Sequence, residues 1–334
     1  IYQGLKAAGY EVTSDAWLSS YETIYADARQ AWKEAVLDKL KQYDGNFFQA
    51  YSTTPFVVPC GNTLDEEAAK ADGADTAVFV LSRITGENAD RHDTEGDYFI
   101  TEEEKALLAQ VSASYDNVVL VINTGGLIDL AFTEAFANIK SIVQFMQAGQ
   151  EGGSAFADIL SGAVNPSGKM TDSWAYTYAD YPNAQTFSHK NGNIETEKYE
   201  EGIFVGYRYF DTFDVPVRYG FGFGLSYTEF SVVGTGISAS GLDTDQPKIS
   251  VTASVKNIGH TYAGKEVVEV YVSCPQNDMP KEFRRLAGFG KTALLSPDET
   301  QDLTITFPLY QLASYHEDKA AWILESGTYG IWVG

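Results

Sequence analysis

The chain has 334 residues, and its 46 Asp and Glu residues outnumber its 23 Lys and Arg residues, which gives a formal net charge of −23. This excess of negative charge excludes nucleic acid as a partner, because phosphate binding rests on Lys and Arg side chains. With 44% hydrophobic and 21% charged residues, the composition is that of a globular protein of two or three domains, and no apolar run reaches the ~20 residues that span a bilayer.

The N-terminus carries no signal-peptide pattern and no initiator Met, so we expect the numbering to begin inside a longer protein. Cys60 and Cys274 are too few and too far apart for a disulfide framework, and we predict two free thiols. The four histidines lack metal-ligand spacing. We therefore expect no metal, no cofactor and no membrane segment, and we favour a cytoplasmic location. A homo-oligomer is left open.

The first part of the chain alternates helices and strands. Residues 1–8 read as a helix that ends at Gly9, followed by a short strand at Tyr10–Thr13. Apolar residues at every fourth position predict a long helix at Tyr21–Leu40. The apolar run Thr76–Leu81 predicts a strand that is buried on both faces.

The alternation continues beyond a long polar loop at Ser82–Phe99. Thr101–Glu104 is a capping-box pattern that opens a helix reaching Ser114. The further elements expected from the pattern are strands at Val118–Ile122 and Ile142–Phe145 and helices at Leu127–Ala137 and Gly152–Leu160. This order predicts an α/β fold with a mostly parallel sheet that is covered by helices.

The character of the chain changes after Asn165–Gly168. Residues 175–229 are rich in Tyr, Phe, Gly and Asn, and we interpret them as an ordered connector packed by its aromatic rings. Period-two runs follow at Ile249–Val255, Val267–Val272, Asp302–Phe307 and Thr328–Val333. Short strands separated by turns predict an immunoglobulin-like β-sandwich. We therefore expect an α/β sandwich domain at 1–174, the connector at 175–229 and an all-β domain at 230–334.

The loop after the Thr76–Leu81 strand is the best candidate for chemistry. Ligands of open α/β sheets bind outside the carboxyl ends of the strands, and this loop leaves such an end. It places Glu87 beside Gly86 and carries several other acids and two arginines. A carboxyl group displayed there can act as a general acid if burial raises its pKa, whereas a solvated acidic loop is the plainer alternative.

Several ordered motifs resemble glycoside hydrolase family 3 β-glucosidases. Ser82–Arg91, with Gly96–Phe99 downstream, resembles the family segment S-R-x-S/A-G-E-G-x-D-R that carries the acid/base glutamate. Further matches occur in the family's order at Gln144–Gly152, Leu160–Lys169, Tyr199–Asp211 and Tyr219–Thr228. The β-rich tail, with Gly264–Val268 and Glu282–Phe289, resembles the family's fibronectin type III-like domain. The resemblance covers nearly the whole chain.

The resemblance implies that Glu87 is the general acid/base. Asn88 departs from the family pattern, in which glycine follows the glutamate. Asp90 and Arg91 match the family's D-R pair and are expected to support the catalytic loop, since a carboxylate and a guanidinium can form a bidentate bond that fixes a loop.

The family's nucleophile is an aspartate, typically in an S-D-W motif on a (β/α)8 barrel, and we find no barrel and no nucleophile in this sequence. Ser14–Trp17 and Thr171–Trp174 are near matches to the motif and are predicted to be surface or packing residues. The implied partner is therefore a barrel domain or chain that carries the aspartate. Whether it precedes the chain, follows it in a permuted order or is separate is left open.

The resemblance thus implies part of a retaining β-glucosidase that hydrolyses β-glucosides such as cello-oligosaccharides, with the chain alone inactive. A β-xylosidase is the alternative within the family. A non-catalytic carbohydrate-binding or scaffolding module is the alternative outside catalysis, and Asn88 is the feature in its favour.

Overall fold

The computed structural model describes residues 1–83 and 90–334. The chain divides into two compact units, Ile1–Leu160 and Ser161–Gly334, and each is described by itself. The first unit holds these elements: α1 (Tyr2–Ala7), α2 (Asp15–Gln42), α3 (Phe47–Ser52), α4 (Glu66–Ala71), β1 (Thr76–Ser82), α5 (Glu102–Ser114), β2 (Asn117–Asn123), a 3₁₀ helix (Ala131–Ala135), β3 (Ile139–Gln144) and α6 (Gly152–Leu160).

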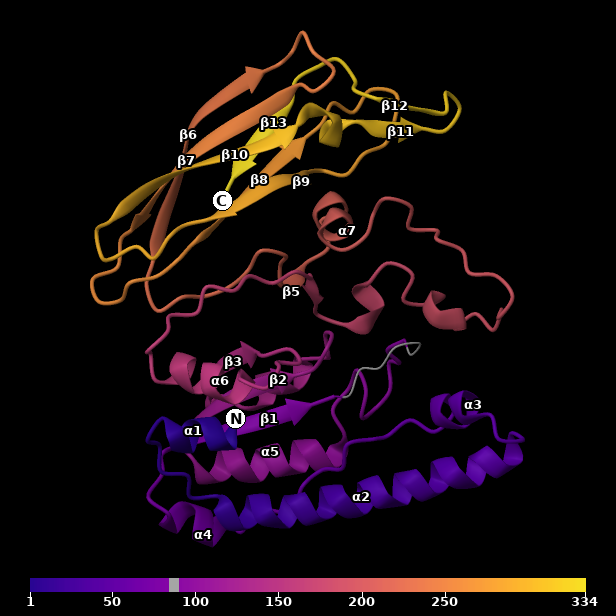
Figure 1. Cartoon of the computed structure of the whole chain (residues 1–334), viewed down its shortest axis with the longest axis vertical. Helices are drawn as coiled ribbons and strands as arrows, with labels where there is room; N and C mark the ends of the chain where they lie inside the picture. Colours follow the sequence, from indigo (N-terminus) through magenta and orange to yellow (C-terminus); the bar gives the residue numbers. More distant parts are fainter. Residues whose placement is uncertain (84–89) are drawn as a thin grey trace. The chain divides into compact units, whose positions relative to one another are not determined.

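The first unit is built on a parallel sheet in the order β1-β2-β3 (Figure 1). The central strand β2 is buried over Val118–Ile122 because helices cover both of its faces. Val119 and Val121 pack against Leu5 of α1 and Phe156 of α6. Val118 packs on the opposite face against Leu108 and Val111 of α5. This three-layer arrangement confirms the predicted α/β sandwich with a mostly parallel sheet.

Helix α5 begins where the capping box predicts. The Thr101 hydroxyl accepts from the Glu104 N–H (3.1 Å), and the Glu104 carboxylate accepts from the Thr101 N–H (2.8 Å). The long helix α2 and the helix α6 are also present where the sequence places them, with α2 longer at both ends. No helix among the described residues combines the length and the apolar character needed to cross a bilayer.

Three expectations for this unit were wrong. Residues 10–13 form no strand, because the Tyr10 N–H bonds to the Leu5 carbonyl (3.1 Å) and closes the end of α1. The expected helix at 127–137 is a short 3₁₀ helix, which starts where the Asp129 carboxylate accepts from the Ala131 N–H (3.1 Å). Strand β1 is not buried on both faces: it lies at one end of the three-strand order, and Val80 is 39% exposed.

The second unit contains the β-rich part of the chain (Figure 1). Its elements are β4 (Trp174–Ala175), 3₁₀ helices at Tyr178–Asp180 and Phe187–His189, α7 (Tyr207–Thr212), β5 (Val217–Tyr219), β6 (Phe230–Ser240), β7 (Lys248–Asn257), β8 (Val267–Ser273), β9 (Arg285–Lys291), β10 (Thr300–Pro308), a 3₁₀ helix (Leu309–Leu312), β11 (Ser314–His316), β12 (Ala321–Ile323) and β13 (Gly330–Val333).

Two antiparallel sheets, β10-β7-β6 and β13-β8-β9, form the β-sandwich of this unit. Inward-facing residues of β7, β8 and β10 fill its core, among them Val255, Val270 and Phe307. Alternation of buried and exposed positions along β7 is the physical origin of the period-two pattern in the sequence. The structure therefore confirms the predicted all-β sandwich, and it adds β6 and β9 as strands and α7 as a helix that the pattern did not indicate.

Candidate active site

The candidate site lies at the carboxyl edge of the parallel sheet. Because β1, β2 and β3 are parallel, Ser82, Asn123 and Gln144 end their strands at the same edge. The Asn123 amide donates to the Ser82 hydroxyl (3.0 Å), which links the first two strand ends. The loop that was predicted to carry chemistry leaves this edge at Arg83. The described start of the loop, at Ser82 and Arg83, therefore lies where open α/β sheets bind ligands.

Arg83 anchors the start of the loop. Its guanidinium is 6% exposed and forms a bidentate ion pair with Glu104 of α5, with Nη1–Oε1 and Nη2–Oε2 distances of 2.6 and 2.8 Å. Its remaining donors bond to backbone carbonyls, Nε to Asp97 (3.0 Å) and Nη2 to Phe99 (3.2 Å). Five N–H donors in a rigid fork explain why an arginine can tie a helix and two points of one loop together.

Arg91 anchors the other side of the loop. Its Nη1 donates to the Asp97 carboxylate (2.6 Å) and to the Asp97 carbonyl (3.1 Å). The second Asp97 oxygen accepts from the His92 N–H (2.7 Å), so one carboxylate joins two neighbouring residues. The Nε and Nη2 atoms of Arg91 are buried and bond to no group in the part of the chain that the structure describes.

The structure describes some of the site residues that were selected from the sequence and not others. Glu87 and Asn88 lie outside the described residues. Asp90 is exposed, and Arg91 is half-buried and paired with Asp97. Arg83, Asp97 and Glu104 were not singled out as site residues. Asp97 lies in the Gly96–Phe99 motif and Glu104 lies in the capping box, so both belong to patterns that the sequence shows. Their ion pairs with Arg91 and Arg83 could be seen only in the folded structure.

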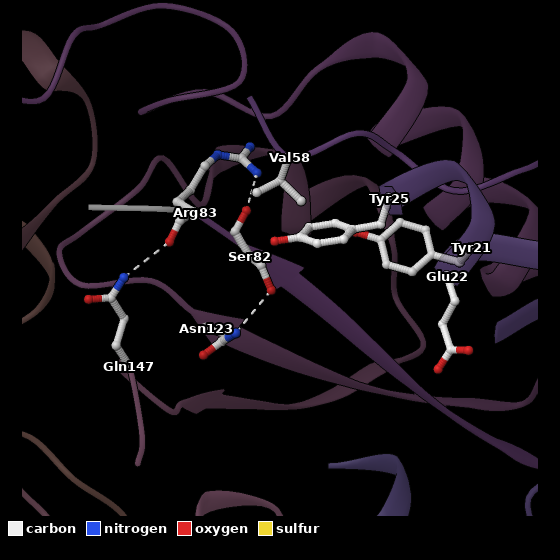
Figure 2. A pocket seen from close by; sticks show the side chains of 8 residues that line it. All are labelled: Tyr21, Glu22, Tyr25, Val58, Ser82, Arg83, Asn123 and Gln147. Carbon is white, nitrogen blue, oxygen red and sulfur yellow. Dashed lines mark hydrogen bonds between the residues drawn. The ribbon is translucent and has the colours of Figure 1, made fainter. Parts of the chain in front are cut away.

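A pocket of about 480 Å³ opens beside Arg83 at the same edge (Figure 2). Its walls are formed by Tyr21, Glu22 and Tyr25 of α2, by Val58, and by the edge residues Ser82, Arg83, Asn123 and Gln147. Burial, with the nearby Tyr25 and Cys60, raises the pKa of Tyr21 above its ordinary value of 10.0. The pocket therefore combines aromatic rings with polar groups, as small-molecule sites do.

The two near matches to a nucleophile motif serve structural roles. Asp15 accepts hydrogen bonds from Tyr2 (2.6 Å) and Lys6 (3.1 Å), and these bonds lower the pKa of its carboxyl. The Trp17 indole donates to the Asn62 carbonyl (3.0 Å). In the second near match Trp174 is 2% exposed and belongs to β4.

Neither a barrel nor a metal-binding cluster is found among the described residues. Across residues 1–83 and 90–334, the parallel sheet has three strands and does not form a (β/α)8 barrel. Within the same ranges, no three His, Cys, Asp or Glu side chains gather closely enough to hold a metal ion.

Two family models match the chain. Residues 3–207 match the glycosyl hydrolase family 3 C-terminal domain, and residues 266–334 match the fibronectin type III-like domain. The chain is 36% identical over 330 residues to a beta-glucosidase of Ruminococcus albus, covering 96% of this chain and 33% of that protein. It is 34% identical over 280 residues to an exo-alpha-(1->6)-L-arabinopyranosidase of Bifidobacterium longum, covering 83% of this chain and 35% of that protein.

Solved structures agree with these matches. Beta-glucosidase 3B of Thermotoga neapolitana, in complex with alpha-D-glucose, superposes with a TM-score of 0.81 at 32% identity, over 100% of this chain and 44% of that one. A beta-glucosidase of Paenibacillus barengoltzii gives a TM-score of 0.78 at 34% identity, over 88% of this chain and 33% of that one. The chain thus spans about a third of the length of the curated relatives that it matches.

Proposed function

The chain belongs to glycoside hydrolase family 3, and we propose that it is the part of a retaining β-glucosidase that supplies the general acid/base, Glu87. The domain bounds expected from the sequence, 1–174, 175–229 and 230–334, are part of this proposal. So is a partner, a (β/α)8 barrel domain or chain that carries the aspartate nucleophile.

The observation that carries the proposal is the pair of anchors around Glu87. Arg83, four residues before Glu87, is held by Glu104, and Arg91, four residues after it, is held by Asp97. The first anchor is buried and directly follows the carboxyl end of β1, and the second lies beside Gly126, just beyond the carboxyl end of β2. A catalytic group needs a positioned segment, and these charge-assisted bonds fix the described residues on both sides of Glu87. Asp90 and Arg91 are assigned supporting roles in this loop.

The chemistry follows the double displacement of retaining glycosidases. Glu87 protonates the glycosidic oxygen while the aspartate of the barrel attacks the anomeric carbon, and a covalent glycosyl-enzyme forms. Glu87 then removes a proton from the water that hydrolyses this intermediate. The two carboxyl groups must lie about 5–5.5 Å apart, so the chain without its barrel is expected to be inactive.

A glucoside is the substrate we favour, because beta-glucosidases are prominent among the relatives. The arabinopyranosidase of Bifidobacterium longum shows that a relative at similar identity acts on another sugar. A β-xylosidase is the other enzyme candidate from the sequence. In this proposal the barrel supplies most of the protein contacts that select the sugar.

The test is Glu87→Ala in the enzyme that contains this chain and its barrel. General acid catalysis contributes roughly 10²–10⁴-fold, and it matters most when the leaving group is poor. We therefore expect a large loss of kcat/KM for cellobiose and a much smaller loss for a dinitrophenyl β-glucoside. Azide should restore turnover of the activated substrate and give a β-glycosyl azide, because it attacks the glycosyl-enzyme without base catalysis.

The matched control is Glu95→Ala, which removes an exposed carboxylate from the same loop. Cellobiose, an aryl β-xyloside and an aryl α-L-arabinopyranoside should be compared on the unaltered enzyme to identify the sugar. Unchanged cellobiose turnover in Glu87→Ala would refute the acid/base role. If the unaltered assembly turned over none of these substrates, the non-catalytic carbohydrate-binding or scaffolding module would be favoured instead.

A further inference from the structure

The pocket beside Arg83 has two chemically different walls (Figure 2). Tyr21 and Tyr25 form the aromatic wall, and both hydroxyls point toward Ser82 on the opposite wall. Val58 adds an apolar group, and the Glu22 carboxylate lines the pocket while pointing away from Ser82. The volume of about 480 Å³ lies within the range of roughly 300–1,000 Å³ that holds small molecules.

The aromatic wall is held in place before any ligand binds. Trp17 and Tyr21 stack with their ring centroids 5.8 Å apart and their planes within 5°. Tyr25 lies 6.4 Å from Tyr21 and meets the edge of Phe56 at 5.5 Å. Rings spaced four residues apart on one face of α2 support each other, so little entropy is lost when they bind a ligand.

The polar groups decide which ligand class fits. Arg83 is the one cation among the eight described residues that line the pocket, and its guanidinium is used by Glu104 and backbone carbonyls. Within the described ranges, no hydrogen bond is recorded for the Tyr21 and Tyr25 hydroxyls or for the Asn123 side-chain oxygen. The groups left for a ligand are therefore hydroxyls, an amide oxygen and ring faces.

This set is unsuited to an anion and suited to a neutral polyhydroxylated molecule. Without an available cation, a phosphate or carboxylate ligand would be desolvated without compensation. A sugar offers hydroxyl groups to the amide and phenol oxygens and an apolar C–H face to the rings. Arg83 forms part of the pocket wall and also begins the segment that leads to Glu87 four residues later.

We propose that this pocket binds the leaving-group sugar of the glycoside, with Tyr25 as a specificity-determining residue. The inference rests on the proposed function, since it assigns a place to the sugar that Glu87 protonates as it departs. The segment that supplies Tyr21 and Tyr25 lies about 60 residues before the catalytic loop, so the sequence motif around Glu87 contains no sign of it.

The first experiment compares substrates that differ only in the leaving group. Tyr25→Ala in the enzyme with its barrel should lower kcat/KM for cellobiose about tenfold, which is the effect of one lost contact in a specificity pocket. The value for β-glucosyl fluoride should not change, because fluoride cannot contact the pocket. Tyr25→Phe, which keeps the ring, should retain most of the cellobiose activity.

The second experiment measures binding without turnover. Saturation-transfer NMR of cellobiose on the 334-residue chain should give a signal that Tyr25→Ala abolishes. Tyr10→Ala is the matched control, because Tyr10 is 39% exposed, Tyr25 is 37% exposed, and both belong to the first unit. Circular dichroism should show that both variants keep the helical content of the unaltered chain.

The outcomes separate the two proposals. Equal changes for cellobiose and glucosyl fluoride, or none for either, would overturn the subsite and leave the acid/base role of Glu87 intact. If the unaltered enzyme turned over neither substrate, the proposed function would be contradicted. The NMR experiment would then still test whether the pocket binds a sugar. A cellobiose signal that is equally strong in Tyr25→Ala would overturn the pocket.

Discussion

Replacing Glu104 with alanine should destabilise the first unit strongly, because it leaves the buried Arg83 guanidinium without its counter-ion. Arg83 is 6% exposed, the Glu104 side chain is 14% exposed, and the two groups share two hydrogen bonds of 2.6 and 2.8 Å. The same carboxylate also accepts from the Thr101 N–H at the start of α5. One substitution therefore removes an ion pair and a helix cap together.

The expected cost follows from these contacts. Breaking a buried ion pair by removing one partner costs about 3–5 kcal/mol, since the remaining charge is desolvated and unpaired. Loss of the capping interaction contributes about 1 kcal/mol. Because such terms are not strictly additive, we expect a loss of about 4 kcal/mol in the free energy of unfolding. Glu104→Gln keeps an oxygen for Thr101 and should cost about 2 kcal/mol, mainly from the lost charge.

Hydrogen exchange measured by mass spectrometry is the suitable assay, because a chain with two units need not unfold in one step. Exchange of the β2 amides around Leu120, which is fully buried, reports opening of the sheet. A loss of about 4 kcal/mol should speed this exchange by a factor on the order of 10³. Glu103→Ala is the control, since Glu103 is exposed in the same helical turn.

Exchange rates that are the same for Glu104→Ala and Glu103→Ala would refute the reasoning. A loss below about 1 kcal/mol would show that the pair behaves like an exposed one. In the proposed enzyme of this chain and its barrel, Glu104→Gln should also lower kcat, because this carboxylate ties α5 to Arg83, which begins the segment that leads to the proposed acid/base Glu87.

Two further predictions concern packing and pH. Gly4→Ala should destabilise the contact of α1 with α6 by about 1–3 kcal/mol, because its Cβ would lie 2.1 Å from the Gly153 carbonyl oxygen. Gly149→Ala, which meets no atom within 4 Å, is its control, and equal melting temperatures for the two variants would contradict the expectation. The hydrogen bond from Lys281 and the N–H groups of residues 277 and 278 lower the pKa of Glu325 from 4.5 to about 2. A carboxyl whose pKa is lower in the folded state stabilises the fold above its unfolded pKa, so stability should fall as the pH drops from about 4.5 to about 2. Urea unfolding should show a weaker pH dependence in Glu325→Gln and an unchanged one in the exposed control Glu317→Gln.

Helices and strands that are specified by residues close together in the sequence could be predicted from the sequence. The capping box of Thr101 and Glu104 defines the start of α5, because both hydrogen bonds join residues three positions apart. Alternation along residues 249–255 predicts β7, because successive side chains of a strand point to opposite faces. The prediction was wrong at residues 127–137. The apolar pattern there predicted a helix of about eleven residues, but the structure has a 3₁₀ helix of five residues, Ala131–Ala135.

The sequence alone also determined the family, through motifs in a fixed order, and it singled out Glu87. Only the tertiary structure decided how the described residues on either side of it, Arg83 and Arg91, are held. Arg83 and Glu104 are 21 residues apart, and Tyr21 and Asn123 share a pocket although about 100 residues separate them. Local hydrogen bonds and side-chain periodicity are encoded in contiguous residues, whereas these contacts exist only after helices and strands have packed together. The physical reason is burial. Burial strengthens the ion pair of Arg83 and holds the pocket in place, and it arises only when segments far apart in the sequence pack together.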